Sequence, residues 1–336
     1  MLELIQRASL HAARTAFRSD AGETTYSHLL QRSAALAGAL LGDASDLAEE
    51  RIAFLVAAGE DYAALQWGIW RAGGVAVPLN RGAAAGELLH VLRSAGVLRL
   101  VADVASPVLI EACAQAGTEI LVLADLESTA SKPVLPDIDP QRRAMIVFTS
   151  GTTSKPKGAV CTHAAIVAMM RTLEQAWGWR SDDCIPLFLP LHHVHGIVNV
   201  LCCALWAGAC IEAFEGFRQD AILQRINDRA YTVFMAVPTL YVRLIQALEA
   251  MAENERLRTC AAFRCMRLMV SGSAALPTTV HTRWEELTGQ RLLERYGMTE
   301  IGMALSNPLQ GERRSGSVGI PLPGVGLRLV DESGAQ

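Results

Sequence analysis

The amino-acid sequence predicts an α/β protein with mostly parallel sheets that helices cover on both faces. Short apolar runs such as Arg51–Ala57 and Leu98–Asp103 alternate with longer amphipathic segments. Hydrophobic residues make up 51% of the 336 residues, and charged residues only 19%. Continuous apolar strands between helices are typical of parallel sheets buried on both sides. A chain of this length and composition buries a large core, so we expect two βα-type subdomains.

Residues 1–143 are the first expected subdomain region. A long helix is predicted for Leu29–Leu41, with Ser27 as a candidate N-cap. The predicted strands are Arg51–Ala57, Gly74–Pro78, Leu98–Asp103 and Ile120–Asp125. Ser128–Arg143 contains three prolines and several charges, which is typical of a linker. We therefore expect the first region to end at residue 143.

Residues 144–310 are the second expected region. Its strand-like runs are Ala144–Phe148, Ala230–Met235 and Leu268–Ser271. The apolar stretch Ile197–Ile211 is shorter than the roughly 20 residues that cross a bilayer, and it contains Asn199. We expect it to form a buried helix, and we expect no membrane span.

The end of the chain has a different amino-acid composition. Glycine and proline dominate after Asn307, and a lone strand is predicted for Gly326–Asp331. Residues 311–336 are therefore expected to begin a small β-barrel subdomain. Because the chain stops soon after this strand, we expect a further C-terminal domain to be missing.

Charge and cysteine usage limit the partners and the compartment. The 30 basic and 34 acidic side chains give a formal charge of −4, so nucleic acid and anionic membrane surfaces are not expected partners. The eight cysteines lie mostly in apolar runs without a C-x-x-C pair, as expected for reduced core residues. The N-terminus has no apolar stretch followed by a cleavage site. A cytoplasmic location is expected, and the mitochondrial matrix stays open.

The strand that ends at Phe148 leads into the hydroxyl-rich segment Thr149–Gly158. Hydroxyls, glycines and two lysines at a strand end suit a polyphosphate, which backbone N–H groups and ammonium charge can bind. The segment is not a Walker A loop, because Pro156 stands where that motif has its second glycine. A polar turn is the alternative, but a turn needs neither the lysines nor so many hydroxyls.

This segment resembles the phosphate loop of the adenylate-forming superfamily, which includes acyl-CoA synthetases, luciferases and peptide-synthetase adenylation domains. It departs from the usual pattern at Ser154, where the family generally has glycine, and a non-glycine residue there resists positive φ. The resemblance implies ATP as substrate and Mg²⁺ as its ion. The expected nucleotide contacts in the loop are Thr149, Ser150, Gly151, Thr152, Thr153 and Lys157, with Thr152 also at the metal and Lys157 in catalysis.

Pro190–Gly196 resembles the histidine block of the same family. By that resemblance His193 lies beside the acyl and phosphate pocket, with a catalytic and a substrate-binding role. A zinc site built from these histidines and Cys202 or Cys203 is the alternative. The H-H-x-H spacing followed by cysteines in an apolar stretch does not fit the usual zinc patterns, which argues against it.

Leu292–Glu300 resembles the family's Y-G-x-T-E block. The resemblance implies that Tyr296 and Gly297 contact adenine, Thr299 the phosphate, and Glu300 the magnesium ion, with Thr299 and Glu300 acting in catalysis. An aromatic face suits a purine, and a carboxylate suits a hard cation. Met298 is expected to contact the acyl substrate.

Two glycine-containing segments complete the resemblance, which covers residues 149–324. Met269–Pro277 is similar to the strand-end segment that lines the adenine and acyl pockets, and Gly316–Gly324 to a later glycine-rich block. The positions expected to line the pockets are Ser271, Gly272, Ser273 and Ala274.

Two arginines inside these blocks point to the acid. Arg243 and Arg295 are candidates to bind the second carboxylate of a dicarboxylic acid, which needs a charged partner when it leaves water. The surrounding sequence resembles malonyl-CoA synthetases, which implies that both arginines, helped by Ser271, hold the distal carboxylate of malonate. Methylmalonate fits the same pair, and surface arginines are the alternative.

The expected function is thus that of an ATP-dependent acid–CoA ligase working through an acyl-AMP, with CoA as co-substrate. In that family a mobile C-terminal domain carries a lysine important for adenylation, and we expect that domain to be missing from this chain. Weak activity is therefore expected of this chain. The alternatives are a medium-chain or aryl acid–CoA ligase, and a non-catalytic module that binds nucleotide or acyl-adenylate.

Overall fold

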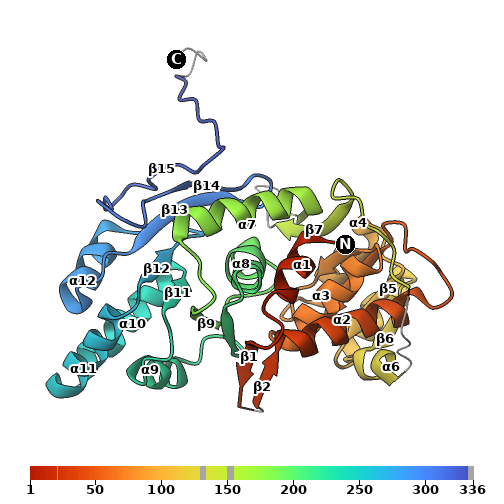
Figure 1. Ribbon diagram of the computed structural model, residues 1–336, viewed down its shortest axis with the longest axis horizontal. Helices are drawn as coiled ribbons and strands as arrows, with labels where there is room; N and C mark the ends of the chain where they lie inside the picture. Colours follow the sequence, from red (N-terminus) through yellow and green to blue (C-terminus); the bar gives the residue numbers. More distant parts are fainter. Residues whose placement is uncertain (21, 129–133, 150–154, 332–336) are drawn as a thin grey trace. The chain divides into compact units, whose positions relative to one another are not determined.

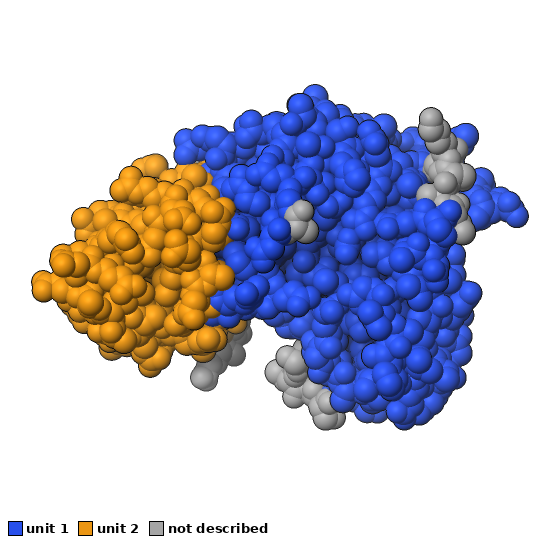
Figure 2. All heavy atoms as spheres, turned by 90° about the horizontal axis from the view of Figure 1, so that it is seen from below, with its two compact units in different colours: residues 1–170, 180–218 blue, residues 171–179, 219–336 orange. Residues whose placement is uncertain are grey.

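The computed structural model describes residues 1–20, 22–128, 134–149 and 155–331. The chain divides into two compact units (Figure 2). Unit 1 comprises residues 1–170 and 180–218, and unit 2 comprises residues 171–179 and 219–336. The helix α7 (His163–Trp177) therefore begins in one unit and ends in the other.

Unit 1 contains a six-stranded sheet in the order β6-β5-β3-β4-β7-β8. Figure 1 labels its strands β5, β6 and β7. Its strands are β3 (Arg51–Leu55), β4 (Val75–Pro78), β5 (Arg99–Ala102), β6 (Glu119–Val122), β7 (Arg143–Thr149) and β8 (Lys157–Thr162). Every pair is parallel except β7 and β8, which form an antiparallel hairpin. The loops after β3, β4 and β5 and the carboxyl end of β7 consequently meet at one edge of the sheet.

Helices cover both faces of this sheet. On one face, α4 (Ala85–Ala95) and α5 (Pro107–Ala116) pack against alternate strand residues such as Val75 and Val77. On the other face, α3 (Glu60–Arg71) places Tyr62 against Phe54. The helix α2 (Tyr26–Leu41) packs on α3 through Gly68, where a methyl group would lie 3.0 Å from Cβ of Leu36.

A second sheet in unit 1 has the order β2-β1-β10-β9. Its strands are β1 (Thr15–Ser19), β2 (Gly22–Thr25), β9 (Cys184–Leu187) and β10 (Cys210–Ala213). The π-helix η1 (His195–Cys202) continues into α8 (Cys203–Ala207), and both are buried. The short helices α1 (Glu3–Ser9) and α6 (Leu123–Ser128) complete the described part of unit 1.

Unit 2 has a five-stranded sheet in the order β11-β12-β13-β14-β15. The strands are β11 (Val233–Ala236), β12 (Leu268–Ser271), β13 (Leu293–Met298), β14 (Gly302–Ser306) and β15 (Ile320–Pro321). The first three are parallel, and β13, β14 and β15 are antiparallel. The helices are α9 (Gln219–Asn227), α10 (Pro238–Ala250), α11 (Glu253–Arg264) and α12 (Thr278–Thr288).

An aromatic cluster holds the helices of unit 2 on its sheet. The Trp284 ring contacts Tyr241 and Phe263 edge-on, with centroids 5.1 and 4.9 Å apart. Phe234 of β11 packs edge-on against both Tyr241 and Phe263. The contacts join α10, α11 and α12 to the sheet, so the parallel strands stay covered.

The predicted α/β class is confirmed, but several details differ from expectation. The expected division at residue 143 does not separate the units, because β7 pairs with β4 inside the first sheet. The helix α2 is capped by Thr25, whose hydroxyl accepts the His28 N–H, rather than by Ser27. The stretch 326–331 forms no strand. Helix is found for 195–207 and is buried as expected, but Cys210–Ala213 is a strand because Gly208 ends α8 at φ 78°.

Four of the eight cysteines, Cys113, Cys202, Cys203 and Cys260, are buried as small core residues, and none of the eight, all of which the structure describes, is in a disulfide. Among the described helices, none is long and apolar enough to cross a membrane.

Burial of His163 makes stability depend on pH. The ring lies edge-on to Trp70, and burial followed by the charge of Arg142 lowers its pKa to about 4. The unfolded chain, with a histidine pKa near 6.5, therefore binds a proton that the folded chain does not bind between about pH 6.5 and 4. The stabilisation is fully present above this window and is lost on acidification, by about 2 kcal/mol at pH 5.

We therefore expect His163→Phe to lose less thermal stability than the unaltered chain between pH 7 and pH 5. Melting temperatures measured by circular dichroism at both pH values test this. His28→Phe, at an exposed histidine of α2, is the control. Identical pH shifts in His163→Phe and the unaltered chain would show that the buried imidazole is not responsible.

Candidate functional site

The carboxyl edge of the six-stranded sheet carries the phosphate-loop candidate. The β7–β8 hairpin pairs Thr149 with Lys157, so the two residues stand side by side where the chain leaves and re-enters the sheet. Gly158 allows this close pairing, because a methyl group there would lie 2.8 Å from Ile146. Lys157 is exposed, and no described side chain forms an ion pair with it. The expected contacts Ser150, Gly151, Thr152 and Thr153 lie outside the described residues, as does Ser154.

The histidine block follows β9 and turns into η1. Gly196 makes the turn possible, because a methyl group there would lie 2.6 Å from the Pro190 carbonyl oxygen. His193 is exposed, and its ring centroid lies 4.2 Å from that of His192. Burial lowers the pKa of His193; burial and then the charge of His193 lower that of His192 to about 4. Both imidazoles are therefore neutral at pH 7.

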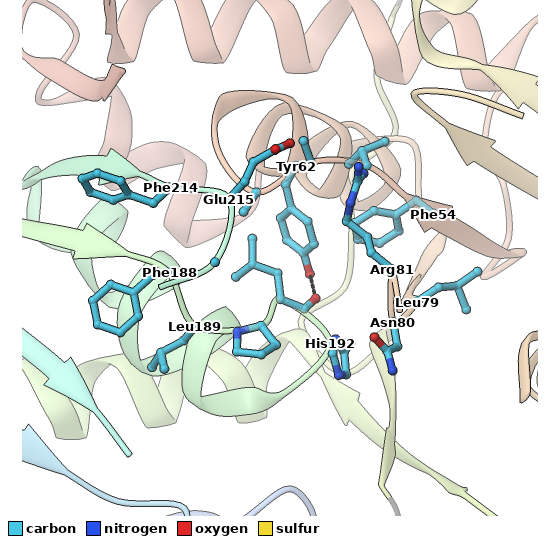
Figure 3. Close-up of a pocket in the computed structure, with 16 residues that line it drawn as sticks. Phe54, Tyr62, Leu79, Asn80, Arg81, Phe188, Leu189, His192, Phe214 and Glu215 are labelled. Atoms are coloured by element: carbon cyan, nitrogen blue, oxygen red, sulfur yellow. Dashed lines mark hydrogen bonds between the residues drawn. The ribbon is translucent and has the colours of Figure 1, made fainter. Parts of the chain in front are cut away.

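Two pockets in unit 1 meet at this block. The smaller one, about 200 Å³, is lined by Phe148, Pro156 and His193 together with α4. The larger one, about 340 Å³, has Phe188 and Phe214 on one side and Asn80, Arg81 and His192 on the other (Figure 3). Leu79, Asn80 and His192 line both pockets. The Tyr62 hydroxyl donates to the Leu191 carbonyl at 2.8 Å, which ties α3 to the histidine block (Figure 3).

Asp103, just after β5, joins the loops that form the larger pocket. Its Oδ2 accepts the Ala57 N–H at 3.1 Å and an Arg81 N–H at 2.6 Å. One carboxylate thus fixes the loops after β3 and β4. Sequence reasoning missed Asn80, Arg81, Asp103 and His192. The available signal was position, since Asn80, Arg81 and Asp103 stand at or just beyond the end of a predicted apolar strand, where open α/β sheets bind ligands.

Arg295 of β13 is the most unusual residue of unit 2. Its side chain is only 4% exposed, and burial lowers its pKa to about 10. Within the described chain, Nε and Nη2 have no hydrogen-bond partner. The guanidinium lies against the backbone of Gly272, where a methyl group would overlap it. A charged group with unused donors in a buried position is an anion site in chemical terms.

Ser271 occupies the opposite face of the sheet from Arg295. The parallel register pairs Ser271 with Glu294, so their side chains share a face, while Arg295 lies over Gly272. The Ser271 hydroxyl and the Arg295 guanidinium therefore point to opposite faces of the sheet, which does not support the expectation that both bind the same carboxylate. Among described atoms the Ser271 hydroxyl has no partner either, and it is fully buried.

The loop after β12 is fixed from β13. The Leu276 N–H donates to Oε1 of the buried Glu294 at 2.9 Å. Ser273 adopts the left-handed φ of 69°, and both Ser273 and Ala274 are exposed. The loop therefore presents these two residues to solvent, as a pocket lining requires.

The Y-G-x-T-E block forms the end of β13 and its turn into β14. Tyr296 and Met298 are 47% and 43% exposed, Glu300 is exposed and Thr299 half-buried. Gly297 permits the hairpin, because a methyl group there would overlap the Gly302 carbonyl. The aromatic face and the carboxylate are thus available to a ligand. Among the described residues, no group of three or more His, Cys, Asp or Glu side chains is arranged to hold a metal ion.

Arg243 lies on α10, whose Tyr241 is buried and donates to the Val270 carbonyl at 2.9 Å. A two-residue step turns the helix by about 200°, so Arg243 lies on the exposed side. The structure thus anchors α10 next to β12, but it does not bury Arg243 with Arg295.

Known proteins resemble this chain throughout. Residues 4–336 match the family described as AMP-binding enzyme. The mitochondrial malonate–CoA ligase ACSF3 of Xenopus laevis is 40% identical over 352 residues, which cover 99% of this chain and 61% of that protein. ATP-bound MatB from Rhodopseudomonas palustris has a TM-score of 0.88 at 31% identity, over 99% of this chain and 67% of that one.

A malonyl-CoA ligase in a ternary product complex with methylmalonyl-CoA and AMP has a TM-score of 0.83 at 34% identity. That match covers 98% of this chain and 68% of that one. The chain spans about 61% of the length of the curated relative from Xenopus laevis.

The environment of Arg295 predicts that its removal stabilises the fold. A lowering of its pKa from 12.5 to about 10 corresponds to a charge penalty of about 3 kcal/mol. We expect Arg295→Met, which keeps much of the side-chain volume, to raise the melting temperature by a few degrees.

The control is Arg291→Met, at an exposed arginine that pairs with Glu285, and it should change the melting temperature little. Differential scanning calorimetry of both variants tests this. A lower melting temperature for Arg295→Met would mean that the guanidinium supports the fold.

Proposed function

Because the chain belongs to the AMP-binding enzyme family, we propose that it is the nucleotide- and acid-binding part of an acid–CoA ligase that activates malonate or methylmalonate. The observation that carries the choice of acid is the buried guanidinium of Arg295, whose Nε and Nη2 lack partners in the described chain. The distal carboxylate of a dicarboxylic acid supplies two acceptors and the opposite charge. The malonate ligases among the relatives support the same substrate class.

A fatty or aryl acid suits this position poorly. Such an acid has no second carboxylate, so the guanidinium would stay buried against an apolar chain without a counter-charge. The buried guanidinium would then retain its desolvation cost in the complex. A medium-chain or aryl acid ligase is therefore the weaker candidate.

In the proposed reaction, a malonate carboxylate oxygen attacks the α-phosphorus of ATP. The new C–O–P bond forms malonyl-AMP, and the bond to the β-phosphate breaks, so pyrophosphate leaves with its charge. The thiol of CoA then attacks the acyl carbonyl, and AMP leaves. Neither step needs a nucleophile from the protein, so the residues act by positioning and by charge neutralisation.

Each candidate residue has a role in this scheme. Lys157 is exposed without an ion pair in the described chain, so its ammonium is available to the polyphosphate, beside Thr149. Tyr296 offers an exposed ring to adenine, and Thr299 in the adjoining turn offers a hydroxyl to phosphate. The exposed carboxylate of Glu300 fits Mg²⁺, which would offset phosphate charge when bound.

The unit 1 pockets provide for the other reactants. Neutral His193 at the smaller pocket can donate to or accept from a reacting oxygen without adding charge. The larger pocket combines aromatic walls with Arg81, which suits the uncharged arm and the phosphates of CoA. Arg243 is retained as a second candidate for the malonate carboxylate.

Acid-dependent pyrophosphate exchange tests the proposal. With Mg²⁺ and ATP, we expect exchange to depend on malonate or methylmalonate and not on octanoate or benzoate. Arg295→Met should lower malonate-dependent exchange roughly 100-fold, since two charge-assisted hydrogen bonds contribute about 3 kcal/mol. Arg291→Met is the matched control and should retain activity. Nucleotide binding without exchange for any acid would instead identify a binding module. Exchange with octanoate as fast as with malonate would favour a medium-chain acid–CoA ligase.

The contact between Gly272 and Arg295 gives a second test. A methyl group at residue 272 would overlap the guanidinium and move it from its position. We expect Gly272→Ala to raise the KM for malonate about 10-fold or more, while the KM for ATP changes little. Steady-state kinetics with each substrate varied in turn measure both values. An unchanged malonate KM would exclude this contact from acid binding, and Gly326→Ala, at a position with open space, is the control.

A further inference from the structure

The carbonyl group next to Lys157 is held by a histidine of α4 that has no role in the proposed reaction. His90 lies on α4, and its Nε2 is 2.8 Å from the Pro156 carbonyl oxygen. Among the described residues this imidazole is the partner of that carbonyl. Pro156 also lines the smaller pocket together with His193 and with Glu87 of α4. The helix therefore both shapes the pocket and holds the chain that enters β8.

The neighbours of His90 fix its tautomer and its orientation. A carbonyl oxygen only accepts hydrogen bonds, so Nε2 must carry the proton. In the neutral ring Nδ1 then has the lone pair, and the Ser94 hydroxyl, one helical turn further on and 3.4 Å away, can donate to it. The ring also stands edge-on to Phe148 of β7, with centroids 6.4 Å apart. The contacts with Ser94 and Phe148 thus hold the imidazole in the orientation in which Nε2 faces Pro156.

We propose that His90 is a positioning residue for Lys157. Its N–H binds the carbonyl of the peptide unit that joins Pro156 to Lys157. Lys157 is the first residue of β8 and pairs with Thr149 of β7. This bond sets the direction in which the exposed ammonium leaves the sheet. The role rests on the proposed function, because it matters for binding of the ATP polyphosphate and not for binding of the acid.

Substitutions that separate the hydrogen bond from general stability test the role. His90→Ala should raise the Kd for ATP·Mg²⁺ about 5- to 10-fold, the effect of one lost hydrogen bond, and leave the KM for malonate within about 2-fold. His90→Gln keeps an N–H donor near the Nε2 position and should restore most of the affinity. Calorimetry gives the Kd, and pyrophosphate exchange with each substrate varied gives the KM values.

Thr118→Ala is the matched control. Its hydroxyl donates to the Val97 carbonyl at 2.8 Å at the amino edge of the same sheet, remote from the phosphate loop in the strand order. We expect a similar loss of thermal stability in Thr118→Ala and no change in the Kd for ATP. An effect in both variants would mean that general destabilisation, not positioning, weakens nucleotide binding.

Hydrogen exchange followed by mass spectrometry examines the tether without any ligand. His90→Ala should exchange faster than the unaltered chain in peptides covering residues 155–162, and His90→Gln should not. Unchanged exchange, an unchanged Kd for ATP, or equal rises in both KM values would each overturn the proposal. If the unaltered chain binds no ATP, the proposed function fails and the nucleotide role of His90 with it. ATP binding together with pyrophosphate exchange that depends on another acid would overturn only the choice of malonate.

Discussion

Parallel strand pairing is the constraint on which both units depend. Parallel strands cannot be joined by tight turns, so each connection must cross a face of the sheet and return to the same end. Burial of the apolar helix faces against the sheet stabilises these crossings. The carboxyl edge is formed by loops that do not build a core of their own. In unit 1, Asn80, Asp103 and Thr149 stand at the carboxyl edge of the six-stranded sheet, and in unit 2 Gly272 stands at the carboxyl end of β12 in a separate sheet. The parallel topology by itself therefore brings these residues to the carboxyl ends of their strands.

Two residues of unit 2 are held in arrangements that cost the fold stability. Arg295 retains its charge in a buried position without a described partner, and Ser273 retains a left-handed backbone conformation. Neither arrangement is needed to pack β13 against β12. Both are supported by well-satisfied neighbours, such as the Glu294 carboxylate that holds the Leu276 N–H. A ligand that supplies the missing negative charge offsets part of the free energy that burial of the Arg295 guanidinium costs the fold.

The class of fold could be predicted from the sequence, because continuous apolar runs indicate parallel strands. Unusual clusters of hydroxyls, lysines or arginines suggested the candidate site residues, and these stay predictions. Sequence reasoning did not find that Asp103 joins the loops carrying Ala57 and Arg81, because that depends on the strand order β5-β3-β4, which spacing does not encode. It also did not find the faces of Ser271 and Arg295, because a one-residue difference in register reverses them. The proline-rich segment before Arg143 resembled a domain linker, yet long-range pairing with β4 decides where β7 belongs.

The path of the chain through α7 has a consequence for synthesis on the ribosome. Residues 171–179 belong to unit 2, but the remainder of that unit begins only at residue 219, after 180–218 have returned to unit 1. The second half of α7 emerges well before its partners, among them Ser306, which binds the Trp177 indole N–H at 3.0 Å. Until those later residues appear, the nascent helix carries an uncovered tryptophan. During translation, all of unit 1 is therefore synthesised before most of the residues that pack with the second half of α7.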